Sequence, residues 1–220
     1  GSYVRGCGLA HGHIPGERMS DSNLVSVVIR TFNEQKHLPE LLAGIRSQVT
    51  PGLEVEVVIV DSGSTDDTVR IANQFGCRIT TISQEEFTFG RSLNVGCDFA
   101  RGEYLVFVSG HCIPCDYAWL RELVEPLRQG LVAYVYGKQV GRDSTKFSEE
   151  QVFRKYYPDE NRLPQDGFYC NNANAALLKE AWRNFRFNES LTGLEDMYLA
   201  KQLVVSGRRV GYVSRAAVFH

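Results

Sequence analysis

Several polar residues in this sequence have types and spacings that could carry out chemistry, and an adjacent acid pair is the first. Glu195 and Asp196 follow Gly193-Leu194 and open a stretch with helical periodicity. Two carboxylates in the first turn of a helix interact favourably with the helix dipole, so a purely structural role is one interpretation. In the other, one carboxylate acts as a general base that accepts a proton from a hydroxyl group while that oxygen attacks a substrate, and its neighbour positions it.

A turn rich in oxygen atoms follows the apolar segment Val55–Val60. Asp61 can accept hydrogen bonds from a uracil base or a ribose, and Gly63 and Ser64 let the backbone approach a nucleotide closely. The same residues are also typical of a simple turn that caps a helix, and both interpretations stay open.

Two histidines are candidate metal ligands. His111 lies just beyond the apolar segment Tyr104–Val108, and His220 follows another apolar segment. A neutral imidazole can bind a divalent cation, although a lone histidine is more often an ordinary surface residue. A cation held there would stabilise the negative charge that develops on a phosphate-containing leaving group. We therefore predict a metal site formed by His111 and His220.

The cysteines are scattered along the chain, which predicts reduced thiols rather than a disulfide framework. A zinc or redox site at Cys112-x-x-Cys115 is the weaker interpretation, because no second pair accompanies it. The full set is Cys7, Cys77, Cys97, Cys112, Cys115 and Cys170.

Strands and helices are predicted to alternate through the first half of the chain, which indicates an α/β fold with a parallel sheet covered on both faces. Ligands bind such sheets at the carboxyl ends of the strands, where Arg30, Asp61 and His111 would converge. A long connection is expected over 141–167, followed by a segment over 168–177 that contains Asn172. Strands are predicted over 24–29, 55–60, 78–82, 104–108, 131–138 and 210–213, and helices over 36–48, 68–74, 92–100, 118–128, 179–184 and 195–206.

Composition fits one globular domain that needs no disulfide or structural metal, with 220 residues, 43% hydrophobic and 23% charged. The formal net charge of −2 gives no global basic field, so nucleic acid is not an expected partner. No apolar run approaches the roughly 18 residues that span a membrane, and no signal peptide is visible. We expect residues 1–18 to be a vector-derived or disordered leader and residues 19–220 to form the domain.

From about Val25 to His220 the sequence resembles the family 2 glycosyltransferases with the GT-A fold. The resemblance rests on four motifs in the same order and spacing. They are Val25–Glu34, Glu56–Asp67, Phe89–Asn94 followed by Ala100–Tyr104, and Gly193–Asp196 with Trp182 and Phe187 upstream. The resemblance implies a Rossmann-like, mostly parallel central sheet. Residues 24–115 would form the nucleotide-binding half and residues 116–220 the acceptor half.

The resemblance also implies roles for individual residues. Asp196 would be the general base of an inverting, single-displacement transfer, with Glu195 beside it. Thr31, Asn33 and Glu34 would line the nucleotide pocket, and Arg91 and Asn94 would face the diphosphate. The whole set expected to contact the nucleotide sugar is Arg30, Thr31, Asn33, Glu34, Asp61, Gly63, Ser64, Arg91, Asn94, Ser109, Gly110 and Asn172.

The sequence departs from the family's pattern at its metal motif. The family usually has Asp-x-Asp, or at least one Asp, where this chain has Ser109-Gly110-His111. An imidazole ligand favours Mn²⁺ over Mg²⁺, because Mg²⁺ prefers oxygen ligands. Catalysis without a metal is the open alternative.

The family further suggests bacterial surface-polysaccharide or glycolipid assembly. The acceptor would be a glycan or lipid-linked glycan, and the protein would be cytoplasmic, with peripheral association at the inner face of the plasma membrane. Two rival functions are a sugar-phosphate nucleotidyltransferase and a non-catalytic module that binds sugar nucleotides. The first needs a glycine-rich loop for triphosphate, which Arg30–Glu34 lacks. The intact acid pair Glu195-Asp196 argues against the second.

Overall fold

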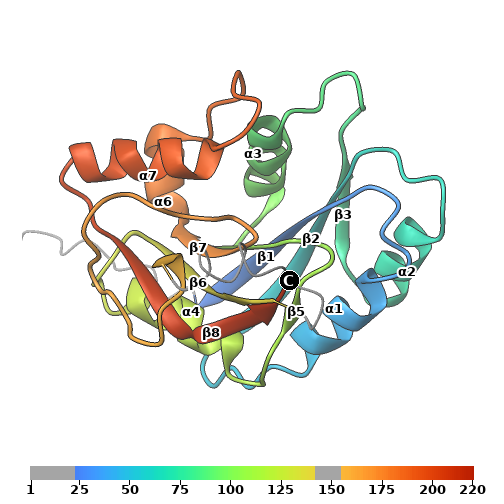
Figure 1. Ribbon diagram of the computed structural model, residues 1–220. Coiled ribbons are helices and arrows are strands. Elements are labelled where there is room, and N and C mark those ends of the chain that lie inside the picture. The colour runs from blue at the N-terminus through green and yellow to red at the C-terminus, as the bar shows by residue number, and fades with distance from the viewer. Residues whose placement is uncertain (1–22, 142–154) are drawn as a thin grey trace, which may run out of the picture.

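A single mixed β-sheet with helices on both faces forms the framework of the protein (Figure 1). The computed structural model describes residues 23–141 and 155–220. The predicted leader, residues 1–18, lies outside these ranges, as does part of the predicted connection over 141–167. In chain order the strands are β1 (Leu24–Thr31), β2 (Glu54–Asp61), β3 (Arg78–Thr81), β4 (Tyr104–Val108), β5 (Ile113–Pro114), β6 (Tyr134–Val140), β7 (Asn174–Leu178) and β8 (Val210–Phe219).

The eight strands follow the order β3-β2-β1-β4-β7-β6-β8-β5 across the sheet. The strands β3, β2, β1 and β4 pair in parallel, as predicted for the first half of the chain. Strand β7 then inserts antiparallel to both β4 and β6, and β5 pairs antiparallel with β8. The expected α/β sheet is confirmed, and its second half is mixed.

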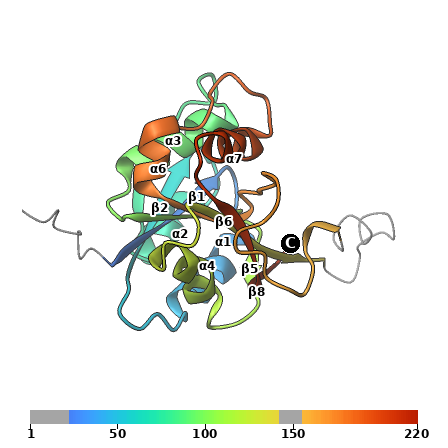
Figure 2. The ribbon, with the colours of Figure 1, turned by 90° about the vertical axis from the view of Figure 1, so that its left-hand side faces the viewer.

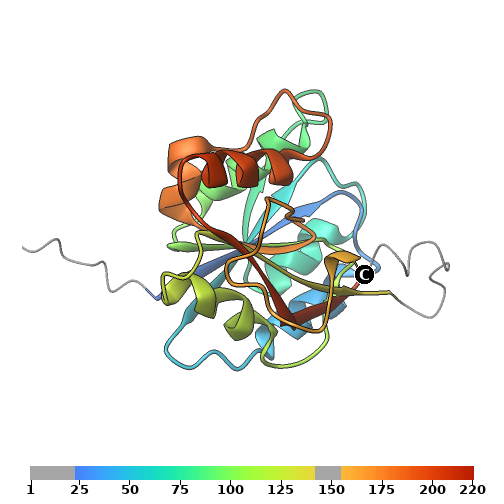
Figure 3. The ribbon, with the colours of Figure 1, turned by 60° about the vertical axis from the view of Figure 1, so that its left-hand side comes forward.

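Helices cover the two faces of the sheet in two separate layers (Figure 2). One layer holds α3, α6 and α7, and the other holds α1, α2 and α4. Figure 3 shows α3 and α7 on the same side of the sheet. The helices are α1 (Leu38–Arg46), α2 (Thr68–Gln74), α3 (Phe89–Phe99), α4 (Trp119–Arg128), α6 (Lys179–Phe185) and α7 (Glu195–Val205).

Each face of the sheet buries its own hydrophobic core, because successive residues of a strand point to opposite faces. In β1, Val28 packs with the layer of α3, α6 and α7, whereas Val27 and Ile29 pack with α1 and α4. In β4, Phe107 packs with the layer of α3, α6 and α7, whereas Val106 packs with the opposite layer. This burial on both faces explains why β1, β2 and β4 read as continuous apolar segments.

Most predicted elements are present, with shifted ends. Helix α3 begins at Phe89 rather than Ser92, because the Thr88 side chain caps it by accepting a hydrogen bond from the Arg91 backbone N–H. Strand β8 continues past Val213 to Phe219, although polar Ser214 and Arg215 interrupt its apolar pattern. The two-residue strand β5 was not predicted.

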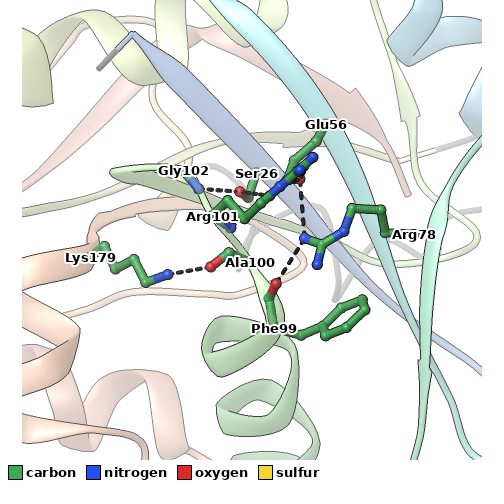
Figure 4. Close-up of polar contacts among 8 residues, drawn as sticks. All are labelled: Ser26, Glu56, Arg78, Phe99, Ala100, Arg101, Gly102 and Lys179. Carbon is green, nitrogen blue, oxygen red and sulfur yellow. Dashed lines mark hydrogen bonds and ion pairs between the residues drawn. The ribbon is translucent and has the colours of Figure 1, made fainter. Parts of the chain in front are cut away.

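A buried carboxylate ties the start of β4 to β1 and β2 (Figure 4). Glu56 on β2 accepts hydrogen bonds from the Ser26 hydroxyl on β1 at 2.6 Å and from the Arg101 backbone N–H at 2.7 Å. The side chains of Arg101 and Arg78 form ion pairs with the same carboxylate. Arg78 also donates to the carbonyl of Phe99, the last residue of α3. This cluster fixes the carboxyl end of α3, whose other end reaches the candidate site.

Candidate active site

A cavity of about 270 Å³ opens where β1 and β4 end, at the edge expected for a ligand in this type of sheet. It combines an aromatic wall with polar groups from the strand ends, as small-molecule sites commonly do. Of the residues predicted to contact a nucleotide sugar, Arg30, Thr31, Glu34, Ser109, Gly110 and Asn172 line it, and so does the predicted metal ligand His111. The other lining residues are Val28, Phe32, Ser62, Phe87, Phe89, Leu93, Phe107 and Val108.

Asp61 lies beneath the loop that follows β2 and does not line this cavity. One of its carboxylate oxygens accepts hydrogen bonds from the hydroxyls of Thr31 and Ser64, at 2.8 and 2.5 Å. The other accepts from the backbone N–H groups of Gly63 and Ser64, at 3.0 and 2.8 Å. The structure thus places Asp61 where it shapes the loop, and the neighbouring Ser62, which was not predicted, lines the cavity.

The loops after β1 and β2 are joined through Asn33. Its backbone N–H donates to the Ser64 hydroxyl at 2.8 Å, and its side-chain oxygen accepts from the Thr65 backbone N–H at 2.8 Å. Asn33 adopts a left-handed backbone with φ of 55°, which asparagine tolerates better than most residues. Asn33, Gly63 and Ser64 therefore position the mouth of the cavity and do not line it.

The carboxylate of Glu34 approaches the loop after β4 closely. A Cβ atom at Gly110 would lie 3.2–3.5 Å from the Glu34 side chain, so a larger residue would push that carboxylate aside. Glu34 and Gly110 both line the cavity next to His111. The absence of a side chain at Gly110 therefore leaves room for the Glu34 carboxylate.

The two predicted metal ligands meet at this end of the molecule. The Nε2 atoms of His111 and His220 are 3.2 Å apart, and both side chains are exposed. The thiol of buried Cys112 completes a group whose ligand atoms all lie within 4.8 Å of one another. Two imidazole nitrogens bound about 2.0–2.1 Å from one ion lie about 3.0–3.4 Å apart, so the observed separation suits a shared cation.

The acid pair lines a second, adjoining pocket of about 250 Å³. Glu195 and Asp196 begin α7, directly after Leu194, which has a left-handed backbone with φ of 62° and is 69% exposed. This conformation is sterically unfavourable for leucine, and strained residues of this kind cluster at functional sites. The two pockets share Arg30, Phe89, Ser109 and Asn172, so they form one continuous cleft.

Asp196 is held by two backbone N–H groups, from Asn172 at 3.0 Å and from Met197 at 2.7 Å. Burial raises the pKa of Asp196 above its ordinary value, although these hydrogen bonds and the charge of Arg30 act in the opposite direction. Burial also raises the pKa of Glu195, and the adjacent Asp196 adds to this effect. Raised carboxyl pKa values in a cleft are typical of a general base that works near neutral pH.

Arg30 lies between the acid pair and the aromatic wall. Its guanidinium lies 5.0 Å from the centre of the Phe89 ring, within the range of a cation–π contact. Burial lowers the pKa of Arg30, and the charges of Glu195 and Asp196 offset part of this shift. An arginine remains protonated under these conditions, so Arg30 brings a positive charge into the cleft.

Arg91 and Asn94 were predicted to face the diphosphate, but neither lines the cleft. Arg91 forms a surface ion pair with Glu86 at 2.9 Å. Buried Asn94 bonds to the backbone of Phe187 through both side-chain atoms, and its oxygen also accepts from the Trp182 indole N–H. These contacts anchor α3 to the segment before the acid pair. An asparagine that binds a ligand and one that anchors a helix have the same polar side chain, so the sequence did not distinguish these two roles.

Aromatic residues of the cleft were missed by sequence reasoning. Phe87 and Phe89 flank the Thr88 cap of α3 and pack edge to face, with ring centres 5.5 Å apart. Phe89 is 42% exposed and Phe32 is 48% exposed, unusual values for phenylalanine. Two aromatic residues around a helix-capping threonine were a usable signal, because helix starts at strand ends often border ligands.

The cysteines that the structure describes form no disulfide with one another. Cys7 lies outside the described ranges. Burial raises the pKa of Cys115 to about 11, which disfavours the reactive thiolate form. The Cys112 thiol lies within 4.8 Å of the ligand atoms of His111 and His220.

Comparison with known proteins identifies the family of this chain. The family model for glycosyl transferase family 2 matches residues 26–185. The chain belongs to glycosyl transferase family 2. The resemblance seen in the sequence is thereby confirmed.

Two curated relatives align with 89% of this chain. An O-antigen chain rhamnosyltransferase, RfbN of Salmonella typhimurium, is 24% identical over 210 residues. A poly(ribitol-phosphate) β-N-acetylglucosaminyltransferase, TarS of Staphylococcus aureus, is 34% identical over 206 residues. The alignments span 66% of the first relative and 35% of the second, so this chain corresponds to part of each.

Solved structures of GT-A glycosyltransferases share the fold. S. aureus TarS in complex with UDP superposes with a TM-score of 0.73 at 20% identity, covering 89% of this chain and 60% of TarS. The mannosyltransferase PcManGT from Pyrobaculum calidifontis, in complex with GDP-Man and Mn²⁺, gives a TM-score of 0.72 at 22% identity, covering 89% and 56%. At these identities the likeness establishes the GT-A fold alone.

Proposed function

We propose that this chain transfers a sugar from a nucleotide-diphosphate sugar to a hydroxyl acceptor, with inversion at the sugar carbon. One observation carries the proposal. His111, whose Nε2 atom lies 3.2 Å from that of His220, lines one pocket of the cleft, the acid pair lines the other, and the two pockets share four residues. Inverting transfer needs a stabilised leaving group and a base on opposite sides of the sugar.

The nucleotide would occupy the larger pocket, beside Thr31, Glu34 and Ser62. The hydrogen bonds of Asp61 and Asn33 hold the two loops that form this pocket in place before a ligand arrives. The exposed ring of Phe32 offers an apolar surface next to these polar groups. A preformed pocket of this kind lowers the entropy cost of binding.

Asp196 would act as the general base. Its side chain is half-buried, its orientation is fixed by two backbone N–H groups, and its raised pKa favours proton uptake. Glu195 is more deeply buried and would position its neighbour and the acceptor. The proton of the attacking hydroxyl passes to Asp196 as the oxygen bonds to the sugar carbon and the diphosphate leaves.

His111 and His220 would hold a divalent cation, and Cys112 lies close enough to contribute. A bound cation would supply positive charge to the diphosphate leaving group. Nitrogen ligands of this kind suit Mn²⁺ better than Mg²⁺, so we propose Mn²⁺. The Mn²⁺ complex of PcManGT, which shares the fold, supports that choice.

We extend the proposal to the biological setting of the relatives, whose names concern O-antigen and poly(ribitol-phosphate). The acceptor would be a glycan or lipid-linked glycan in surface-polysaccharide or glycolipid assembly. No helix in the described ranges is long and apolar enough to cross a membrane. We place the reaction in the cytoplasm, at the inner face of the plasma membrane, with peripheral association.

Calorimetry with UDP, GDP, dTDP and CMP, each with and without Mn²⁺, tests the proposal. We expect one nucleoside diphosphate to bind in the micromolar range and Mn²⁺ to strengthen that binding. If no nucleotide binds under either condition, the proposed function is wrong for this chain.

A further inference from the structure

Two buried nitrogen atoms at the junction of the two pockets make no hydrogen bond within residues 23–141 and 155–220. They are Nη1 of Arg30 and Nδ2 of Asn172. Buried polar groups in folded proteins are nearly always hydrogen-bonded, so each exception needs an explanation. Both residues line both pockets, so a ligand that spans the cleft would supply the missing acceptor atoms.

A hydrogen bond from the buried Tyr134 hydroxyl holds the side-chain amide of Asn172 in one orientation. The hydroxyl of Tyr134 donates to its side-chain oxygen at 2.5 Å, and Tyr134 is fully buried. Burial raises the pKa of Tyr134 well above its ordinary value, so this hydroxyl stays protonated and can donate. The side-chain oxygen of Asn172 is thus occupied by Tyr134, and its nitrogen is the side-chain atom left for a ligand at a residue that lines both pockets.

The same residue also contacts the acid pair. The backbone N–H of Asn172 donates to Oδ2 of Asp196 at 3.0 Å. Its side chain and its backbone therefore serve two different parts of the cleft. A ligand bound to the Asn172 amide would lie next to the carboxylate that the Asn172 backbone holds.

The order of groups along the cleft decides which part of a ligand lies at this junction. In a single displacement, the transferred sugar lies between the leaving group and the attacking hydroxyl. Under the proposed function, His111 lies at the leaving-group end of the cleft and the acid pair lies at the hydroxyl end. The junction, formed by Arg30, Ser109 and Asn172 with Phe89, is the part between them.

We propose that Asn172 is a specificity-determining residue, whose side-chain nitrogen donates a hydrogen bond to a hydroxyl oxygen of the transferred hexose. Arg30 supplies a second donor to the same sugar, and Tyr134 is the positioning residue that orients the Asn172 amide. This inference rests on the proposed glycosyltransferase function. Sites that bind a hydroxyl with a buried polar group discriminate strongly against sugars in which that oxygen is absent or misplaced.

The test compares how tightly the protein binds a nucleotide with and without its sugar. Wild type, Asn172→Ala, Tyr134→Phe and Tyr212→Phe would be titrated in a calorimeter with UDP and UDP-N-acetylglucosamine, GDP and GDP-mannose, and dTDP and dTDP-rhamnose. Tyr212→Phe is the matched control, because the Tyr212 hydroxyl donates to the Pro158 carbonyl and not to Asn172. Melting temperatures check that each variant is folded.

We expect Asn172→Ala to bind the free diphosphate within about twofold of wild type and the sugar nucleotide about tenfold more weakly, the loss of roughly one hydrogen bond. Tyr134→Phe should weaken only the sugar nucleotide, by about threefold, and Tyr212→Phe should weaken neither. The inference is overturned if Asn172→Ala leaves both affinities unchanged or lowers both equally. If wild type binds none of the probes, the proposed function itself has failed.

Discussion

The Nε2 atoms of His111 and His220, which are 109 residues apart in the sequence, lie 3.2 Å from each other. His111 precedes β5 and His220 follows β8, and the antiparallel pairing of these two strands brings the histidines together. The sequence places each histidine after an apolar segment, and the structure gives their separation.

Alanine at either histidine should weaken Mn²⁺ binding by about 10-fold to 100-fold, because each substitution removes a predicted ligand. Electron paramagnetic resonance of free Mn²⁺ during a titration measures this directly. His37→Ala is the control, since His37 precedes α1 and lies outside the group of candidate ligands. Unchanged Mn²⁺ affinity in both His111→Ala and His220→Ala would contradict the metal site.

Asp196→Asn should lower the turnover number by about 10²-fold to 10⁴-fold, because asparagine cannot accept the proton of the attacking hydroxyl. Nucleotide binding should stay within about twofold of wild type, since Asp196 lines the other pocket. Hydrolysis of the bound nucleotide sugar, with water as acceptor, measures turnover without knowledge of the natural acceptor. Glu195→Gln should lower the turnover number less than Asp196→Asn does. Equal losses in the two variants would contradict the assignment of Asp196 as the base.

Activity should rise with pH through a pKa above the ordinary aspartate value of about 3.9, because burial raises the pKa of Asp196 and only the ionised form is a base. The charge of Arg30 lowers the pKa of both carboxyl groups, so Arg30→Met should move this rise to higher pH. The pH profile of kcat/KM measures the shift. Arg70→Met, at a surface ion pair with Asp67, should leave the profile in place. A shift to lower pH in Arg30→Met would contradict the electrostatic argument.

Glu56→Gln should destabilise the fold by about 1–3 kcal/mol at neutral pH, because buried N–H and hydroxyl groups would lose a charged acceptor. Burial alone would raise the pKa of Glu56, but hydrogen bonds from Ser26 and Arg101 outweigh it and lower the pKa.

This lowered pKa gives the effect of Glu56 a definite pH dependence. The carboxylate stabilises the fold above its unfolded pKa of about 4.3, and this contribution is lost as pH falls through the lower folded pKa. Urea unfolding at several pH values should therefore show the difference between wild type and Glu56→Gln shrinking toward acid. Glu54→Gln, at an exposed position of the same strand, should change stability little. A difference that grows at acid pH would contradict this assignment.

The parallel half of the sheet could be predicted from the sequence because its strands are buried on both faces and read as apolar segments. The position of β7 could not, because antiparallel insertion between β4 and β6 depends on contacts between distant segments. In β8, Ser214 and Arg215 hide the continuation to Phe219, which is specified by pairing with β6 and β5.

The candidate site, like the sheet, could be predicted only in part from the sequence. Arg30, His111 and Asp196 were predicted because each follows a strand or opens a helix, and all three line the cleft. Asn94 has an equally polar side chain, but its oxygen already accepts hydrogen bonds from Trp182 and Phe187. Whether an asparagine binds a ligand or anchors a helix is decided by its tertiary partners, which one sequence does not show.

The antiparallel pair β5–β8 closes the far edge of the sheet with two residue pairs, Ile113 with Phe219 and Pro114 with Val218. His111 and His220 flank this short pair on its two chain segments. An ion held by both histidines would cross-link those segments at the outermost strand, where a sheet frays most easily. Ordering of that edge and binding of the cation would then be thermodynamically linked, so a change that loosens β5 from β8 would also lower the affinity for the ion.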